Sequence, residues 1–367
     1  MHGMEGDLSM VKLLGGPELK FIDSYYMQPN EAITSSHCTN KLEDAPIGEL
    51  IIVGTSYYRP DEGYEQMEAE KGRILIILVS GGPSDERKKL KLVVSLEVDG
   101  GVNALGVCAG KVVACVNANN CIYKWTSLMS APTASASSPP SMGGLHSKGS
   151  LQCVCTLPGQ TMGVSISTLG KQILVGDLLK SLSLYELDDA AEGVKLRLLM
   201  NDVASHYILG ASLNANRIMA SDTLGNLLRY EEAADPFISN RKVLRVCEGY
   251  FLGTPIVKII NQSSGLFVLI GESGQAWELR TRDDDFGVLK RLEEVLAGRL
   301  APLHQQHRML FDKHPPQQQQ QKQTSQIVDG DLLVRFMELP FKEKEEIAAV
   351  VGLPAPAISQ LLLQHQK

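Results

Sequence analysis

Five stretches of the chain repeat one short pattern, and this repeat constrains the fold more than any other feature of the sequence. Each has a turn, four to six mostly apolar residues, a small residue, a polar turn and then a run of alternating apolar and polar residues. The stretches begin at Gly48, Gly110, Gly170, Ala215 and Ser264. Their apolar residues are mostly Val, Ile and Leu, and the runs are bounded by Gly, Asn, Asp or Ser. The pattern therefore predicts β-hairpins rather than helices.

A second set of strand candidates lies between these hairpins. They are Leu90–Val98, Leu151–Leu157, Val194–Met200 and Arg241–Gly249, and each is followed by another short apolar run. The repeating unit thus holds four strands and recurs about every 45 to 60 residues, which is typical of β-propeller blades. The sequence predicts an all-β propeller of WD-like four-stranded blades, five visible of an expected seven, followed by a small α-helical C-terminal domain.

Shifts in composition divide the chain into five segments. They are 1–29, a partial outer strand and N-terminal remnant; 30–282, the propeller blades, in which 130–150 is expected to be a disordered insertion; 283–313, a helical segment; 314–326, a Pro/Gln-rich linker; and 327–367, a helical C-terminal domain. The stretch Pro17–Asp23 resembles an outer strand whose own blade is missing. Because a propeller must close to bury every blade face, we expect the chain to be the C-terminal part of a longer protein.

The last segments carry the signals of helix ends. Three acidic residues open 283–300, and apolar residues follow at helical spacing. Further along, Asp331 is expected to cap a helix, and Pro340 and Gly352 are expected to bound the next one. The apolar stripes of these helices are expected to pack on the propeller, with reception of a partner helix as the alternative.

The turn at Gly176-Asp177 admits two interpretations, a small chemical site on a loop or the turn of a repeated hairpin. Asp222 and Glu272 occupy the equivalent place in their own repeats. Residues that recur at every such turn are expected to shape hairpins, not to catalyse a reaction. The chain also has no P-loop, no GxSxG and no HExxH motif. We therefore expect a protein that is not an enzyme.

Charge and cysteine usage narrow the class of partner. The formal charge of −7 disfavours direct nucleic-acid binding by this chain alone, since such binding relies on basic side chains at the phosphates. The seven cysteines show no metal-like spacing and are expected to be free thiols. His304, His307 and His314 are followed by Pro and Gln instead of further ligands. We expect no metal and no cofactor, and no apolar run approaches the length needed to span a membrane.

Four longer motifs resemble a known family. They are the VGT-x-Y segment at Val53–Tyr57 with KGRI at Lys71–Ile74, GKVVACVNANNCIYKWT from Gly110, ILVGDLLKSLSLYEL from Ile173, and VDGDLLVRF from Val328. Together they resemble the DNA damage-binding protein 1 family from roughly Leu19 to the C-terminus. The large subunits of the cleavage and polyadenylation specificity factor and of splicing factor 3b belong to the same superfamily.

The resemblance implies a non-catalytic protein-interaction scaffold with three propellers and a helical C-terminal domain. This chain would supply most of the third propeller and the tail of a cullin-RING ubiquitin ligase adaptor that acts in DNA repair. Its partners would be WD-type substrate receptors, whose helical segments enter a cleft formed with the first propeller, and the other propellers of the same full-length scaffold. The middle propeller, which holds the cullin, is not part of this chain. The implied location is the nucleus, and also the cytoplasm. The alternative is a scaffold subunit of the mRNA 3′-end cleavage and polyadenylation or splicing machinery.

Five residues are partner-binding candidates by this resemblance: His206, Tyr207, Asp222, Glu272 and Gln275. His206 and Tyr207 stand where the family loop has an aromatic–Met pair, and GESGQ at Gly271–Gln275 replaces a GTVNG turn. Both stretches therefore depart from the family pattern. The alternative is that His206 and Tyr207 are ordinary rim residues.

Overall fold

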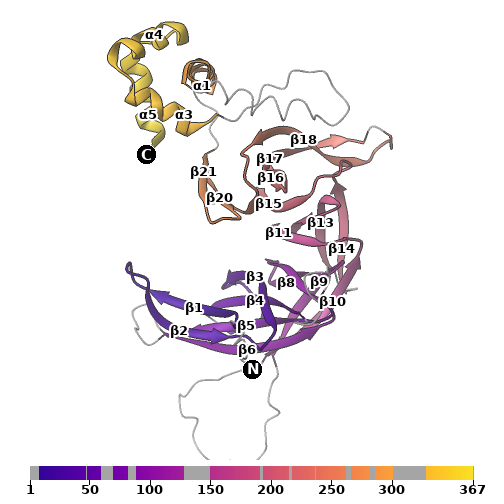
Figure 1. Cartoon of the computed structure of the whole chain (residues 1–367). Helices are drawn as coiled ribbons and strands as arrows, with labels where there is room; N and C mark the ends of the chain where they lie inside the picture. Colours follow the sequence, from indigo (N-terminus) through magenta and orange to yellow (C-terminus); the bar gives the residue numbers. More distant parts are fainter. Residues whose placement is uncertain are drawn as a thin grey trace, which may run out of the picture. The chain divides into compact units, whose positions relative to one another are not determined.

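The computed structural model describes residues 8–46, 48–58, 69–81, 88–127, 149–190, 193–214, 217–235, 237–261, 266–280, 286–300 and 328–366 (Figure 1). These residues form a five-bladed β-propeller of antiparallel sheets followed by helices, which confirms the predicted fold class. By its internal packing the chain divides into two compact units, Met1–Ile218 with Glu232–Leu244, and Met219–Glu231 with Arg245–Lys367.

Each blade is a meander whose strands follow one another in chain order. The first blade is β3 (Glu31–Thr39), β4 (Glu49–Tyr57), β5 (Gly72–Ser80) and β6 (Lys89–Val98). The second is β7 (Val102–Cys108), β8 (Lys111–Val116), β9 (Asn119–Ser127) and β10 (Gly149–Pro158). The third is β11 (Gly163–Leu169), β12 (Gln172–Asp177), β13 (Ser181–Ala190) and β14 (Gly193–Asn201). The fourth is β15 (Ile208–Asn214), β16 (Arg217–Asp222), β17 (Asn226–Ala234) and β18 (Lys242–Phe251). The fifth has three described strands, β19 (Ile256–Asn261), β20 (Leu266–Gly271) and β21 (Ala276–Arg280).

Burial explains why the middle strands of the blades are nearly continuous apolar runs. Ile74, Leu75, Ile76 and Ile77 on β5 are all fully buried, because neighbouring layers cover both faces of the first sheet. One face contributes Ile52 and Ile76 to a core shared with the second blade. The outer strand β14 instead alternates exposed and partly buried residues over most of its length, since its side chains meet solvent on one face.

A two-stranded sheet of β1 (Met10–Gly15) and β2 (Lys20–Tyr26) covers the other face of the first blade. Val11 and Tyr25 from this sheet pack against the cluster that contains Val53 and Leu75. Pro17–Asp23 was expected to be an outer strand, and β2 overlaps it. That this sheet is the remnant of a further blade, and that the full ring has seven blades, stay predictions.

The second unit contains the C-terminal helices α1 (Phe286–Leu300), α3 (Gly330–Glu338), α4 (Phe341–Val351) and α5 (Ala355–Gln366), which share one apolar core. The prediction that Asp331 caps a helix was wrong. Asp329 is the N-cap of α3, and its carboxylate accepts the Leu332 N–H at 3.1 Å, because the helix begins at Gly330. Gly352 ends α4 in the left-handed conformation, as predicted.

Several predictions fall outside the described residues. They concern most of the 130–150 insertion, the 314–326 linker, and His304, His307 and His314. Of the residues assigned to the insertion, Gly149 and Ser150 are described and belong to β10. Within the described ranges, no single helix is long and apolar enough to cross a membrane, and only the pair α4 and α5, bent by 90°, meets the criteria of length and composition.

Candidate protein-interaction site

Asp177 is the last residue of β12, and its buried side chain stabilises the turn between β12 and β13. Its side chain is fully buried, and each carboxylate oxygen accepts two backbone N–H groups. Thr161 and Met162 donate to Oδ2 at 2.7 and 2.9 Å, and Leu179 and Lys180 donate to Oδ1 at 2.8 Å each. The carboxylate therefore ties its own turn to the loop that leads into β11. This geometry fits the hairpin-shaping role and offers no oxygen for proton transfer to a ligand.

Asp222 holds the equivalent turn of the fourth blade with fewer bonds. Its Oδ1 accepts the N–H groups of Leu224 and Asn226 at 3.0 and 2.9 Å, and its Oδ2 accepts the Asn226 side-chain amide at 2.7 Å. Asp222 is only 4% exposed, whereas Leu224 at the tip of the turn is 68% exposed. Any partner contact made by this turn is thus carried mainly by its tip, and the contact assigned to Asp222 stays a prediction.

Glu272 and Gln275 are both exposed on the turn between β20 and β21. The Gly271 N–H donates to the Gln275 carbonyl at 2.8 Å, and the Glu272 N–H donates to the Pro255 carbonyl at 3.1 Å. Ser273 donates a hydrogen bond to the Gln275 side chain. The backbone of this turn is therefore well supported while both candidate side chains face solvent.

His206 and Tyr207 lie on the loop between β14 and β15, and they differ in exposure. The His206 side chain is 19% exposed, and its Nδ1 lies 2.8 Å from Oδ2 of Asp202, a carboxylate that is itself 2% exposed. Tyr207 is 48% exposed. The structure thus places His206 as a support of the loop and Tyr207 on its surface.

Asp202 joins this loop to the neighbouring turn, a role that the sequence did not reveal. Its carboxylate accepts Ser181 Oγ at 2.6 Å and the Ala204 N–H at 2.9 Å in addition to the His206 contact. Its own N–H donates to the Leu182 carbonyl at 2.9 Å. Since Ser183 pairs with Asn201, the two segments lie at the same end of the third blade.

Three exposed apolar side chains lie on the two segments that Asp202 connects: Leu179 (45%), Val203 (59%) and Tyr207 (48%). We call these three residues the apolar rim of the third blade. All three belong to the first unit, whereas Asp222, Glu272 and Gln275 belong to the second. The carboxylates of Asp177 and Asp202 accept backbone N–H groups in the two segments that carry the rim, those of Leu179 and Ala204.

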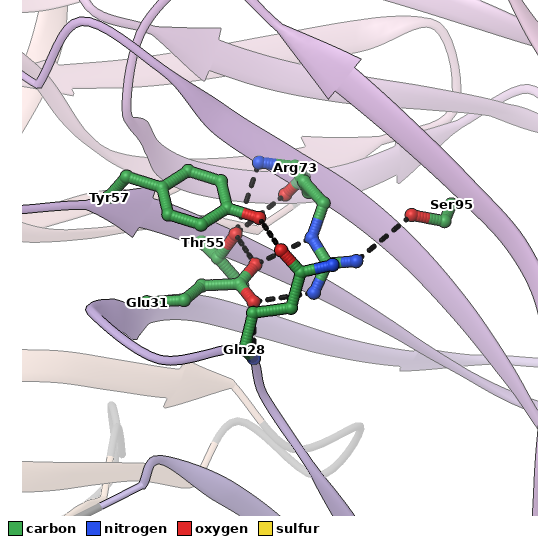
Figure 2. Close-up of polar contacts among 6 residues, drawn as sticks. All are labelled: Gln28, Glu31, Thr55, Tyr57, Arg73 and Ser95. Atoms are coloured by element: carbon green, nitrogen blue, oxygen red, sulfur yellow. Dashed lines mark hydrogen bonds and ion pairs between the residues drawn. The ribbon is translucent and has the colours of Figure 1, made fainter.

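A buried ion pair organises the same end of the first blade (Figure 2). Arg73 donates from Nε and Nη2 to the two oxygens of Glu31 at 2.8 and 2.5 Å, and the side chains are 7% and 0% exposed. Thr55 Oγ1 and the Gln28 N–H complete the carboxylate shell at 2.5 and 2.8 Å. Burial alone would raise the pKa of Glu31, but the hydrogen bonds from Arg73, Thr55 and Gln28 outweigh it and lower that pKa.

The ion pair and its hydrogen bonds bring together residues of two sequence motifs that are separated along the chain. Thr55 and Tyr57 come from the VGT-x-Y segment and Arg73 comes from the KGRI segment. The Tyr57 hydroxyl donates to Gln28 Oε1 at 2.6 Å, and the Tyr57 N–H donates to the Lys71 carbonyl at 2.9 Å. The cluster therefore fastens the end of β4 to the start of β5. Both Glu31 oxygens are occupied, so the cluster is suited to holding structure and not to acid–base chemistry.

The metal prediction can be examined only over part of the chain. Among the residues that the structure describes, no group of three or more His, Cys, Asp or Glu side chains is arranged to hold a metal ion.

The comparisons with known proteins agree with this architecture. The model of the CPSF A subunit region matches residues 9–338. DNA damage-binding protein 1 of Oryza sativa subsp. japonica is 25% identical over 97% of this chain and 31% of its own length. DNA damage-binding protein 1 of Solanum lycopersicum is 23% identical over 95% of the chain, and DNA damage-binding protein 1a of Arabidopsis thaliana is 24% identical over 94%. The chain spans about 30% of the length of these relatives. Because the family model covers most of the sequence, the chain belongs to the CPSF A subunit region family.

Proposed function

We propose that this chain is a non-catalytic protein-interaction scaffold that docks WD-type substrate receptors within a cullin-RING ubiquitin ligase. The similarity to proteins named DNA damage-binding protein 1 supports a scaffold role, and it also supports a nuclear location and a place in DNA repair. The receptor type follows from the motif resemblance. Direct nucleic-acid binding is not part of the proposal, since the chain carries a net charge of −7.

The observation that carries the proposal is the apolar rim beside Asp202. Leu179, Val203 and Tyr207 expose apolar surface at one end of the third blade. At this end the Asp202 carboxylate accepts hydrogen bonds from the Ser181 hydroxyl and the Ala204 N–H. An amphipathic helix recognises such a surface by burying its own apolar face, with few directional bonds. Exposed aromatic side chains on a rigid support are typical energetic anchors of protein interfaces.

Binding of a purified WD-type substrate receptor tests the proposal. The chain is mixed with that receptor, with and without the first propeller of a DNA damage-binding protein 1 supplied as a separate polypeptide. We expect weak or no binding without the first propeller and measurable affinity with it. Tyr207→Ala should weaken the affinity about 10-fold, whereas Leu198→Ala should not change it. Leu198 is a matched control because it is 49% exposed on the outer strand β14. If Tyr207→Ala leaves the affinity unchanged, the rim is not part of the binding surface.

The second candidate function is a scaffold of mRNA 3′-end processing or splicing. The family model that matches the chain is that of the CPSF A subunit region, and this match favours the second candidate at the level of the family. Co-purification of the tagged chain from nuclei distinguishes the two. Strong recovery of polyadenylation factors without substrate receptors would replace the first proposal with the second.

A further inference from the structure

Three cysteines lie on the last two strands of the second blade. Cys121 is on β9, and Cys153 and Cys155 are on β10, which pairs with β9. The proposed scaffold role uses none of these thiols. They differ in their access to solvent, because Cys153 is exposed, Cys155 is partly buried and Cys121 is only 6% exposed. The group therefore combines a thiol that a soluble reagent can reach with one that the fold shields.

A β-bulge in β10 decides which of these side chains share a face of the sheet. The register of β10 against β9 shifts between Cys153 and Cys155. Val154 and Cys155 both pack against the core cluster that the second blade forms with the third. Cys121 instead belongs to the cluster formed with the first blade. Cys155 is therefore turned away from Cys121, although the two are near each other in register.

The hydroxyl of Thr156 brings the other two thiols together. Thr156 stands directly opposite Cys121 in the ladder, and its Oγ1 lies 3.9 Å from Cys121 Sγ. The same oxygen lies 3.3 Å from Cys153 Sγ, which also lies 3.6 Å from the Cys155 carbonyl oxygen. Both sulfurs thus contact one oxygen atom from neighbouring strands. They form a thiol pair across the ladder, in which one member is exposed and the other is buried.

The two thiols differ in reactivity for a physical reason. Burial raises the pKa of Cys121, and a negative charge on Cys153 raises it further. Because the thiolate is the nucleophile, an oxidant in solution reacts first with an accessible thiol and last with a buried one of raised pKa. Cys153 is therefore the thiol that meets the oxidant, and Cys121 is placed to react with the product.

We propose that Cys153 and Cys121 form a modification site for hydroperoxides, in which oxidation of Cys153 leads to a disulfide with Cys121. In the first step the Cys153 thiolate attacks a peroxide oxygen and the O–O bond breaks. Cys153 becomes a sulfenic acid, and the hydroperoxide is reduced to an alcohol, or to water if it is hydrogen peroxide. In the second step the Cys121 sulfur attacks the Cys153 sulfur and the S–O bond breaks. The hydroxyl group leaves as water with the Cys121 proton, so the two thiols give up two electrons and two protons to the peroxide.

The disulfide links β9 and β10 where their pairing is interrupted. A bulge leaves the ladder locally disrupted, so the strands can adjust there to an S–S bond of about 2 Å. The bond also closes the chain between positions 121 and 153 into a loop, which restricts the unfolded state. The oxidised protein is therefore the more stable form. This site is independent of receptor docking, because the apolar rim lies on other strands and loops.

Disulfide mapping on the full chain tests the site. The reduced chain is treated with hydrogen peroxide in the presence and absence of dimedone, which traps sulfenic acids. The remaining thiols are blocked with iodoacetamide, and the peptides are mapped by mass spectrometry without reduction. Cys153→Ser, Cys121→Ala and Cys155→Ser are treated in parallel. Cys155→Ser is the matched control, because Cys155 lies on the same strand but packs against the other core cluster. Thermal unfolding of the reduced variants verifies that they are folded, and the map of the unchanged chain decides the outcome even if a variant does not fold.

Without dimedone we expect a linked Cys121–Cys153 peptide in the unchanged chain and in Cys155→Ser, lighter by two hydrogen atoms than the two separate peptides together. The link should be lost completely in Cys153→Ser and Cys121→Ala, and with dimedone Cys121→Ala should accumulate the adduct on Cys153. Dithiothreitol should remove the link and lower the unfolding temperature of the oxidised chain to that of the reduced one. A link between Cys153 and Cys155, a Cys153 disulfide between two copies of the chain, or sulfinic acid on Cys153 without a link overturns the proposal. A Cys153 that stays reduced overturns it as well. Failure of receptor binding leaves every one of these outcomes unchanged, so the two proposals are tested separately.

Discussion

The guanidinium of Arg73 and the carboxylate of Glu31 form a buried two-point ion pair between β5 and the first residue of β3, at 2.8 and 2.5 Å. Removing either partner leaves an uncompensated buried charge. We expect Arg73→Met and Glu31→Gln each to lower the free energy of unfolding by about 3 to 5 kcal/mol. The double variant Glu31→Leu/Arg73→Met should cost less than either single one, because neither charge remains. Urea unfolding of the four proteins measures this, and additive losses would contradict it.

The same ion pair makes stability depend on pH in the acid range. The pKa of Glu31 in the folded protein is lowered from its ordinary value of 4.5. A lowered pKa contributes stability that is fully present above the unfolded value and is lost as the pH falls through the folded one. The stability difference between the unchanged chain and Glu31→Gln should therefore be constant near neutral pH and shrink below about pH 4.5. Urea midpoints measured across this range test the prediction, and a difference that shrinks above pH 6 would refute it.

Asp177 and Asp222 occupy equivalent turns but support different numbers of bonds. In Asp177→Asn the new amide would face two backbone N–H donors that Oδ2 now accepts, those of Thr161 and Met162. We expect a loss of about 3 kcal/mol, because buried donors are left without acceptors. Asp222→Asn should cost about 1 kcal/mol or less, since the Asn226 side-chain amide can reorient. Thermal unfolding of both variants compares them, and equal losses would show that the cross-loop bonds of Asp177 are unimportant.

Asp202 is expected to control the mobility of the loop between β14 and β15. Asp202→Ala removes the acceptor of the Ala204 N–H and of Ser181 Oγ. Amide hydrogen exchange at Ala204 should accelerate about 10-fold or more, while the amides of β12 remain protected. Ser181→Ala should have a smaller effect, because it leaves the Ala204 and His206 contacts in place. Exchange measured by mass spectrometry decides this, and an unchanged loop in Asp202→Ala would mean that other contacts hold it.

The cysteines should differ strongly in reactivity. Burial raises the pKa of Cys108 to about 11 and also raises the pKa of the fully buried Cys115. Cys38 and Cys153 are exposed. Because the thiolate is the reactive form, iodoacetamide near neutral pH should label Cys38 and Cys153 first and spare the two buried thiols until the protein unfolds. Peptide mapping by mass spectrometry follows the order, and early labelling of Cys115 in folded protein would contradict the burial.

Much of the architecture could be predicted because local chemistry repeats. The run Leu90–Val98 was predicted as a strand and differs from β6 by one residue, and the predicted run Val194–Met200 lies within β14. Gly352 as a helix end is likewise a local signal, because the left-handed conformation suits glycine. The misplaced cap, Asp331 instead of Asp329, shows the limit of this approach: two acids near the start of one helix are equivalent until the first turn is located.

The alternation of apolar and polar residues and the turn chemistry by themselves determined a propeller of four-stranded units and a helical tail, since these depend only on neighbours along the chain. Only the tertiary structure decided that Glu31 meets Arg73, that Asp202 joins two loops, and that Phe237 remains exposed while Phe267 is fully buried. Such contacts join residues separated by tens of positions in the sequence. Their existence depends on how the sheets stack, and stacking is a property of the whole fold rather than of any segment.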